Sequence, residues 1–167
     1  MNVAEVLQDA FDRVRDETRQ VLAGLTREQL IARPAAQVNT VAWLVWHLVR
    51  VQDDHVSEVA GRPQTWIAGG WAKRFALPFE DSATGYGQSA QEVGQVQVDA
   101  DLLQGYLDAT HAATSEFLRD LTDRDLDRIV DRRWTPPVTL GVRLVSVIAD
   151  DLQHVGQAAY VRGLLGG

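Results

Sequence analysis

The segment from Asn39 to Ala60 constrains the fold more than any other part of the sequence. Its first half, VAWLVWHLV, is apolar on nearly every side of a helix, so this helix must lie deep in a bundle. Asn39 or Thr40 is a suitable N-cap, and Gly61-Arg62-Pro63 ends the helix. We therefore predict a buried central helix with other helices packed around it.

Three further segments have the apolar spacing of long helices. A capping-box pattern at Thr26–Gln29 predicts a short helical turn after the first of them, ended by Pro34. A second capping box at Ser89–Glu92 leaves the start of the third long helix open between Ser89 and Asp99. The three predicted segments are about 3–25, 89 or 99 to 121, and 139 to 163 or 166.

The connection over residues 61–88 carries seven glycines and prolines and five aromatic residues. It predicts a long crossover that packs through its aromatic side chains and contains a helical turn or two. Strand-like alternation is scarce. Four long helices and one long crossover predict an all-α four-helix bundle, which we expect to be a single domain over residues 1–167.

Two six-residue stretches suggest an internal repeat. Leu25–Leu30 and Leu121–Leu126 each follow a long helix and precede a proline-bearing stretch and a histidine-containing helix. The pattern favours two helix pairs related by a pseudo-twofold axis. Chance recurrence of capping boxes is the alternative.

Composition narrows the chemistry and the partners. The 167 residues include no cysteine, which excludes disulfides, thiolate metal sites and a cysteine nucleophile. The formal charge of −7 and the lack of a basic face argue against nucleic acid or an anionic membrane as a partner. With neither a secretion-signal pattern nor an apolar run of membrane-spanning length, we expect a cytoplasmic protein that acts on a small molecule.

Two histidines on different predicted helices are candidate metal ligands. His47 lies within the most apolar helix, where an imidazole costs free energy unless its nitrogens find partners. Asp150 and His154 are four residues apart, so both project from one face of the last helix. Two nitrogens and one carboxylate suit zinc, nickel, iron or manganese and leave positions open for water or substrate.

Other assignments stay open at this point. Asp151, three residues before His154, competes with Asp150 as the third ligand, and the aspartates could instead be a solvated acidic pair. His47 could be a core histidine bonded to a carbonyl or hydroxyl. His55 lies about 12 Å along the helix from His47, too far to share an ion. We expect His55 and His111 to be structural or surface groups, and we find no pairing residue for His111.

The motifs around the candidate ligands resemble those of a known family. Residues 39–48, NTVAWLVWHL, resemble the second helix of the DinB-like family, with its metal histidine near the middle. Residues 154–157, HVGQ, resemble that family's last-helix motif, histidine-x-glycine-glutamine. The resemblance also reaches the Trp66–Trp71 loop and Gly85-Tyr86-Gly87, so it covers most of the chain. It implies a four-helix bundle that holds a divalent ion.

Carried over residue by residue, the resemblance implies His47, His154 and Asp150 as the metal ligands. Many members have histidine at the third position, whereas the branch with mycothiol-dependent maleylpyruvate isomerase has an acidic residue there. The resemblance thus implies a divalent metal, with zinc or nickel favoured, and a transferase or isomerase that uses mycothiol or another low-molecular-weight thiol. A bound divalent ion can hold a thiol as thiolate near neutral pH. A non-catalytic metal- or ligand-binding stress-response bundle is the alternative.

Four neighbouring features carry weaker expectations. Arg50, Trp46 and Tyr160 lie close along the sequence to a proposed ligand and could line the pocket mouth, although ordinary packing explains them equally well. Gln157 could orient a ligand. The tryptophan-rich loop could supply an apolar face for a homodimer. No catalytic residue is assigned.

Overall fold

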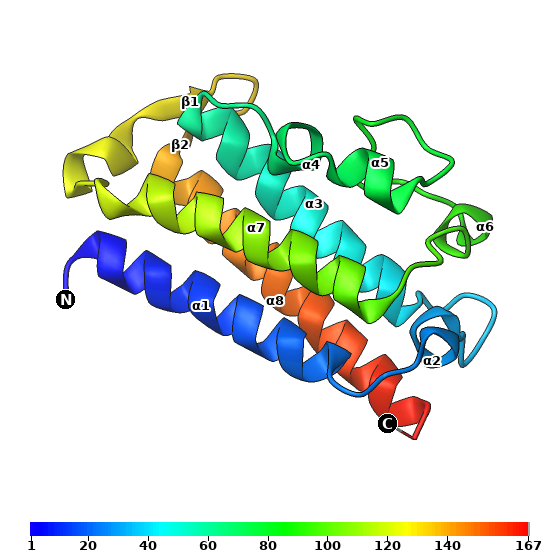
Figure 1. The fold of residues 1–167 in the computed structure, drawn as a ribbon. Coiled ribbons are helices and arrows are strands. Elements are labelled where there is room, and N and C mark those ends of the chain that lie inside the picture. Colours follow the sequence, from blue (N-terminus) through cyan, green and yellow to red (C-terminus); the bar gives the residue numbers. More distant parts are fainter. Residues whose placement is uncertain (167) are drawn as a thin grey trace.

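Four long helices form an antiparallel bundle in the structure, a computed structural model that describes residues 1–166. They are α1 (Val3–Leu22), α3 (Val41–Ala60), α7 (Ala100–Arg119) and α8 (Leu140–Leu164). α1 and α8 run in one direction along the bundle, while α3 and α7 run in the other (Figure 1). No helix within residues 1–166 combines the length and the apolar character needed to cross a membrane. The all-α four-helix bundle predicted from the sequence is confirmed.

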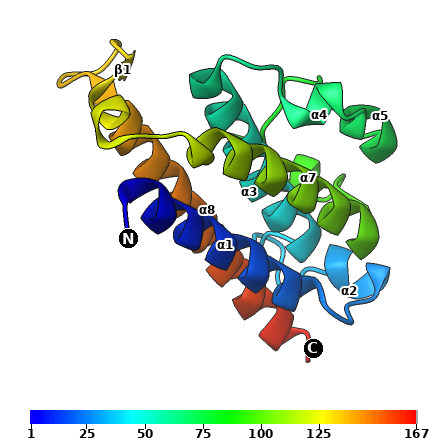
Figure 2. The same cartoon turned by 60° about the vertical axis from the view of Figure 1, so that its left-hand side comes forward.

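Each long helix packs against two others. α3 contacts α8 most extensively and also contacts α7, while α1 contacts α7 and α8. Turning the molecule shows α1 beside α8 along most of its length (Figure 2). α3 and α8 are therefore neighbours although about 100 residues separate them, and each carries one of the two candidate metal histidines.

Side-chain caps start the long helices α1, α3 and α8. Asn2 and Glu5 form a capping box at α1, and Thr40 accepts a hydrogen bond from the Trp43 amide at α3. Gly61, in the left-handed region at φ 67°, ends α3 where the Gly-Arg-Pro sequence predicts. α1 ends at Leu22, three residues before the expected end, because Gly24 turns the chain with φ 75°.

Short elements fill the connections. They are α2 (Arg27–Ile31), α4 (Thr65–Ala68), α5 (Trp71–Phe75), α6 (Ala90–Val93), the 3₁₀ helix η1 (Asp123–Asp127), β1 (Ile129–Asp131) and β2 (Val138–Thr139). The capping boxes at Thr26, Ser89 and Thr122 each start one of the short helices. Ser89 thus begins α6, and the third long helix starts after Asp99. The small antiparallel hairpin β1–β2 was not expected, because strands of two and three residues are too short to show alternation.

The core divides into two apolar clusters along the bundle axis. The larger surrounds the first half of α3, and the smaller joins the other end of the four helices. Between them lies a short buried polar layer, in which Gln52 Nε2 donates to Thr114 Oγ1 at 2.8 Å. Val41–Arg50 is buried throughout, as its apolar sequence predicts.

The long crossover is fastened to α3 by a buried carboxylate. Asp53 accepts hydrogen bonds from the backbone amides of Thr65 and Trp66, at 2.8 and 2.7 Å, and from the Tyr106 hydroxyl at 2.8 Å. Trp66 is buried and packs against Phe75 and Tyr106, with ring centroids 5.0 and 5.1 Å away. The crossover therefore uses these aromatic residues for internal packing, as predicted.

Candidate metal centre

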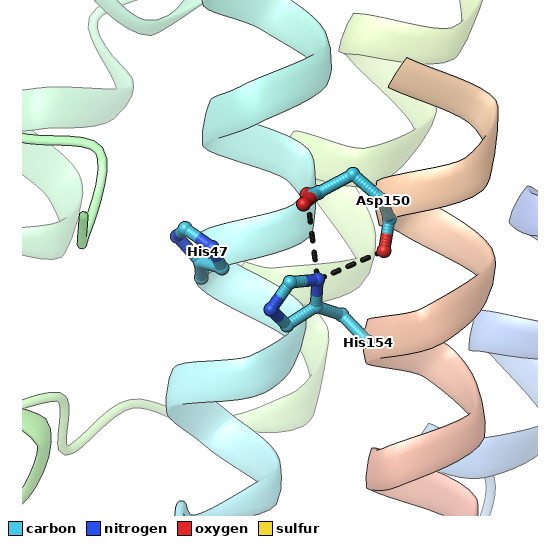
Figure 3. Close-up of side chains that lie close together, drawn as sticks. All are labelled: His47, Asp150 and His154. Atoms are coloured by element: carbon cyan, nitrogen blue, oxygen red, sulfur yellow. Dashed lines mark hydrogen bonds and ion pairs between the residues drawn. The ribbon is translucent and has the colours of Figure 1, made fainter. Parts of the chain in front are cut away.

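His47, Asp150 and His154 meet in the gap between α3 and α8. One candidate ligand atom from each residue lies within 4.8 Å of the other two. The imidazole rings of His47 and His154 meet edge to face, with centroids 4.6 Å apart and planes at 74°, while the Asp150 carboxylate lies beside them (Figure 3). Two distant stretches of the chain thus bring together three side chains of types that can bind a metal.

His47 is held from the side away from α8. Its Nδ1 lies 2.5 Å from the Thr84 carbonyl oxygen, and since a carbonyl can only accept, Nδ1 carries the proton. The ring also stacks on Trp43, one turn earlier on α3, with centroids 4.7 Å apart and planes at 13°. The Nε2 lone pair is then available for a metal, and burial lowers the pKa of His47, which favours the neutral form that binds metal.

His154 and Asp150 support each other on α8. His154 Nδ1 donates to the Asp150 carbonyl oxygen at 2.8 Å and lies 3.3 Å from the Asp150 Oδ2 (Figure 3). The interaction with the Asp150 carboxylate raises the pKa of His154, and the same interaction lowers the pKa of Asp150. Both Nδ1 atoms in the cluster are therefore bonded to carbonyls, and Nε2 of each histidine is the free ligand atom.

The unsatisfied atoms of the cluster fit a metal ion. Asp150 Oδ2 is shielded from solvent and accepts no well-directed hydrogen bond, because the His154 Nδ1–H points at the backbone carbonyl instead. Ligand atoms about 2.0–2.2 Å from a tetrahedral ion lie about 3.3 Å apart, so small side-chain rotations suffice to close the present spacing. Three protein ligands leave further coordination positions open.

The structure distinguishes Asp150 from Asp151. Asp150 lies in the cluster, whereas Asp151 lies outside it and is fully buried, with 0% of its surface exposed. Neither carboxylate oxygen of Asp151 has a hydrogen-bond partner, and burial raises its pKa well above the usual range. Asp150 is therefore the residue that can complete the set with the two histidines.

The other two histidines lie outside the cluster. His111 Nε2 lies 2.6 Å from Asp12 Oδ1 on α1, so the expectation that His111 has no pairing residue was wrong. The pair joins α1 to α7 and is a structural contact. His55 lies two turns from His47, and its Nδ1 accepts from Arg143 Nη1 at 3.2 Å.

A cavity of about 200 Å³ lies directly beside the cluster, between α3 and α8. Arg143 borders it and is nine-tenths buried, bonded to Glu58 at 2.6 Å and to Asp131 at 3.5 Å. A larger open hollow of about 610 Å³ lies along α1 and α7, but its lining contains no histidine. We take the smaller cavity as the one relevant to chemistry because Asp150 forms part of its wall. Its lining residues are Val51, His55, Arg143, Ser146, Val147 and Asp150.

The three residues expected at the pocket mouth do not line the cavity. Arg50 is fully buried and donates to the Ala83 carbonyl, and Trp46 is buried against Trp66 and Phe79, so neither lines an opening. Tyr160 is 70% exposed and lies outside the cavity wall. Gln157 is exposed, and within residues 1–166 it makes no hydrogen bond to the cluster.

The contacts that orient His47 were missed from the sequence. Thr84 acts through its backbone carbonyl, which every residue type carries, so no residue pattern could identify it. Stacking of Trp43 on His47 had a signal, because the two are four residues apart on one helix. The Gly85-Tyr86-Gly87 motif was noted as part of the family resemblance, but it did not predict that this segment contacts His47.

The fold and the cluster together define a helical bundle with a potential two-histidine, one-carboxylate metal site between two facing helices. The chain belongs to the DinB superfamily, whose family model matches residues 10–158. It is also similar to a conserved protein from Enterococcus faecalis of known crystal structure, with a TM-score of 0.93 and 34% sequence identity. That similarity covers 100% of this chain and 99% of the other. Among curated proteins, no sequence matches this chain.

Proposed function

We propose that this protein binds a divalent metal ion through His47, Asp150 and His154 and acts as a thiol-dependent transferase or isomerase on a small electrophile. The observation that carries the proposal is the convergence of the three ligand atoms within 4.8 Å on facing helices. The donor set suits zinc or nickel. Membership of the DinB superfamily supports a metal site in this place.

The chain's own residues would hold and orient the ion. Thr84 and the Asp150 carbonyl fix the two imidazoles in the tautomer that presents Nε2, and Trp43 keeps the His47 ring in its plane. A bound divalent ion would supply the means to keep a thiol ionised near neutral pH. Because the chain has no cysteine, that thiol must come from a cofactor such as mycothiol or another low-molecular-weight thiol.

The cavity between α3 and α8 is the proposed place for the electrophile. Asp150 belongs both to its wall and to the cluster, so a molecule within it would lie close to an ion bound there. His55 and Arg143 give it a polar side, and Val51 and Val147 give it an apolar side. These side chains favour a small substrate with one polar and one apolar part.

Elemental analysis of the untagged protein tests the metal site. We expect stoichiometric zinc or nickel in the wild type and in His55→Gln, which changes a histidine on the same helix outside the cluster. We expect loss of the metal in His47→Gln. Wild-type protein without metal after incubation with zinc or nickel would contradict the proposal.

A reaction screen tests the chemistry. The metal-loaded protein, incubated with a low-molecular-weight thiol and a panel of small electrophiles, should consume both, and His47→Gln should lose that activity. The panel should also include unsaturated substrates that isomerise without net thiol consumption. Failure across thiols and electrophiles, with full metal loading, would leave the metal site standing and overturn the enzymatic part.

The size of the cavity favours a second candidate function, a non-catalytic metal-binding bundle. At about 200 Å³ it is smaller than typical small-molecule sites, which are about 300–1,000 Å³. In this case the metal would bind without turnover, and its coordination would be completed by protein or tightly held water. X-ray absorption spectroscopy of the metal-loaded protein with and without added thiol separates the two candidates, since a metal–sulfur distance appears only in the first.

A further inference from the structure

We propose that residues 81–88, here called the clasp, position His47 for metal binding, and that Gly85 is the residue on which this depends. The inference rests on the proposed metal site and deepens it, because it names what holds one ligand in place. The clasp belongs to the long crossover between α5 and α6, and three side chains of α3 grip it.

Those three side chains come from one face of α3, at spacings of four and three residues. Trp43 Nε1 donates to Gln88 Oε1 at 2.7 Å, and His47 Nδ1 donates to the Thr84 carbonyl at 2.5 Å. Arg50 Nε donates to the Ala83 carbonyl at 3.0 Å. Because residues at these spacings project in the same direction, α3 presents a row of donors that the clasp completes.

Gly85 allows the clasp to lie close enough for the His47 contact. Its φ of +100° is in the left-handed region, and a Cβ atom there would stand 2.7 Å from His47 Nδ1. The same atom would stand 3.1 Å from ring atoms of both Trp43 and Trp46, which are themselves packed in the core. Any residue other than glycine would therefore push the clasp away from His47 and lengthen the bond to Thr84.

The two metal histidines differ in how they are supported. His154 finds the carbonyl for its Nδ1 four residues earlier on its own helix. His47 finds its carbonyl 37 residues away, on the long connection between α5 and α6. The orientation of His47 is therefore a tertiary property, and a change in the clasp should affect His47 while leaving His154 in place.

Gly85→Ala tests the proposal, with Gly87→Ala as the matched control. Gly87 lies in the same segment with φ +74°, but a Cβ atom there meets nothing within 4 Å. Both substitutions carry backbone strain, and of the two only Gly85→Ala adds an atom beside His47. In competition titrations with a chromophoric zinc chelator, we expect Gly85→Ala to bind zinc about 10- to 100-fold more weakly than Gly87→Ala, the usual cost of losing a partner that orients a ligand.

A second measurement examines His47 without any metal. Two-dimensional ¹⁵N NMR of the imidazoles in metal-free protein should show the Nδ1–H tautomer for His47 in the wild type and in Gly87→Ala. In Gly85→Ala the His47 signals should move toward a mixture of tautomers, while those of His154 stay unchanged. A purely structural role for Gly85 would lower stability without this selective change.

The outcomes separate this inference from the proposed function. Equal zinc affinity and equal His47 tautomer in the two alanine variants would overturn the role of the clasp. If the wild type binds no zinc, the proposed function fails, while the NMR comparison still decides whether the clasp orients His47. Should Gly85→Ala not fold, Gln88→Leu removes the Trp43 hydrogen bond without backbone strain and should move both readouts in the same direction by a smaller amount.

Discussion

At the scale of single residues, the candidate site consists of three titratable groups whose pKa values are shifted by their surroundings. Burial lowers the pKa of His47, and the contact with His154 lowers the pKa of Asp150, so both favour the form that binds metal. Asp150 in turn raises the pKa of His154. His154 is therefore the ligand at which protons compete most strongly with a metal ion.

Zinc affinity should fall as the pH is lowered through the raised pKa of His154. Below that pKa the imidazole carries a proton that the metal must displace, so the affinity should drop by about tenfold for each further pH unit. Chelator competition at several pH values between about 5.5 and 8 measures this. A flat profile over this range would show that His154 is not a ligand.

Asp151→Asn should make the protein more stable in mildly alkaline solution. Burial without a partner raises the pKa of Asp151, so the folded state binds its proton more tightly than the unfolded chain and stability falls as the pH rises above about 3.9. Asparagine removes that dependence, and at pH of about 8 we expect a gain of at least about 1 kcal/mol in the free energy of unfolding. Urea titrations at about pH 5 and pH 8 measure it. Zinc content should not change, because Asp151 lies outside the cluster.

At the scale of elements, α3 is the helix that contacts both the core and the long crossover. On one face, Trp43, His47 and Arg50 donate hydrogen bonds to the clasp. One turn further along, Asp53 accepts a hydrogen bond from the Thr65 amide at the start of α4. The opposite sides fill the core. These four side chains lie where the crossover passes α3, and each of them is hydrogen-bonded to it.

Asp53→Ala should destabilise the protein by about 3–5 kcal/mol, because it removes a buried charge and leaves its partners unsatisfied. Those partners are the amides of Thr65 and Trp66, the hydroxyls of Ser57 and Tyr106, and the nearby Arg50. Urea unfolding gives the value. Asp54→Ala is the control: Asp54 accepts one hydrogen bond, from Gln64, and its loss should cost about 1 kcal/mol or less. Equal costs for the two variants would contradict the anchoring role of Asp53.

At the scale of the whole molecule, the candidate metal site joins the two helices that pack most extensively. His47 comes from α3, and Asp150 and His154 come from α8, so an ion bound there would cross-link the first and second halves of the chain. The unfolded chain does not bring these ligands together. Metal binding should therefore stabilise the fold as a unit.

Zinc at about 100 times its Kd should raise the Tm by about 5–10 °C. Ligand binding at that ratio contributes about 2.7 kcal/mol, and a domain of this size shifts by about 2–4 °C for each kcal/mol. Differential scanning calorimetry measures the shift, and EDTA should reverse it. His55→Gln should keep the shift, whereas His47→Gln should lose it. An equal shift in His47→Gln would place the zinc elsewhere.

The sequence by itself was sufficient to predict much of this protein. The apolar run around His47 predicts a buried helix, the capping box at Thr26 predicts the start of a short helix, and the four-residue spacing places Asp150 and His154 on one face. These predictions succeed because they depend on local geometry, which residue type and spacing set directly. The resemblance to DinB-like proteins supplied the pairing of the two helices.

Other features depend on the tertiary structure. The relative orientation of the packed helices decides three of them. It places Asp150 and not Asp151 in the cluster, pairs His111 with Asp12, and buries Arg50. The contact of Thr84 with His47 depends on a backbone carbonyl and on the path of a long connection. Neither can be recognised from the types of residue in the sequence. Contacts between distant segments are set by packing of the whole bundle, so they emerge when the chain has folded.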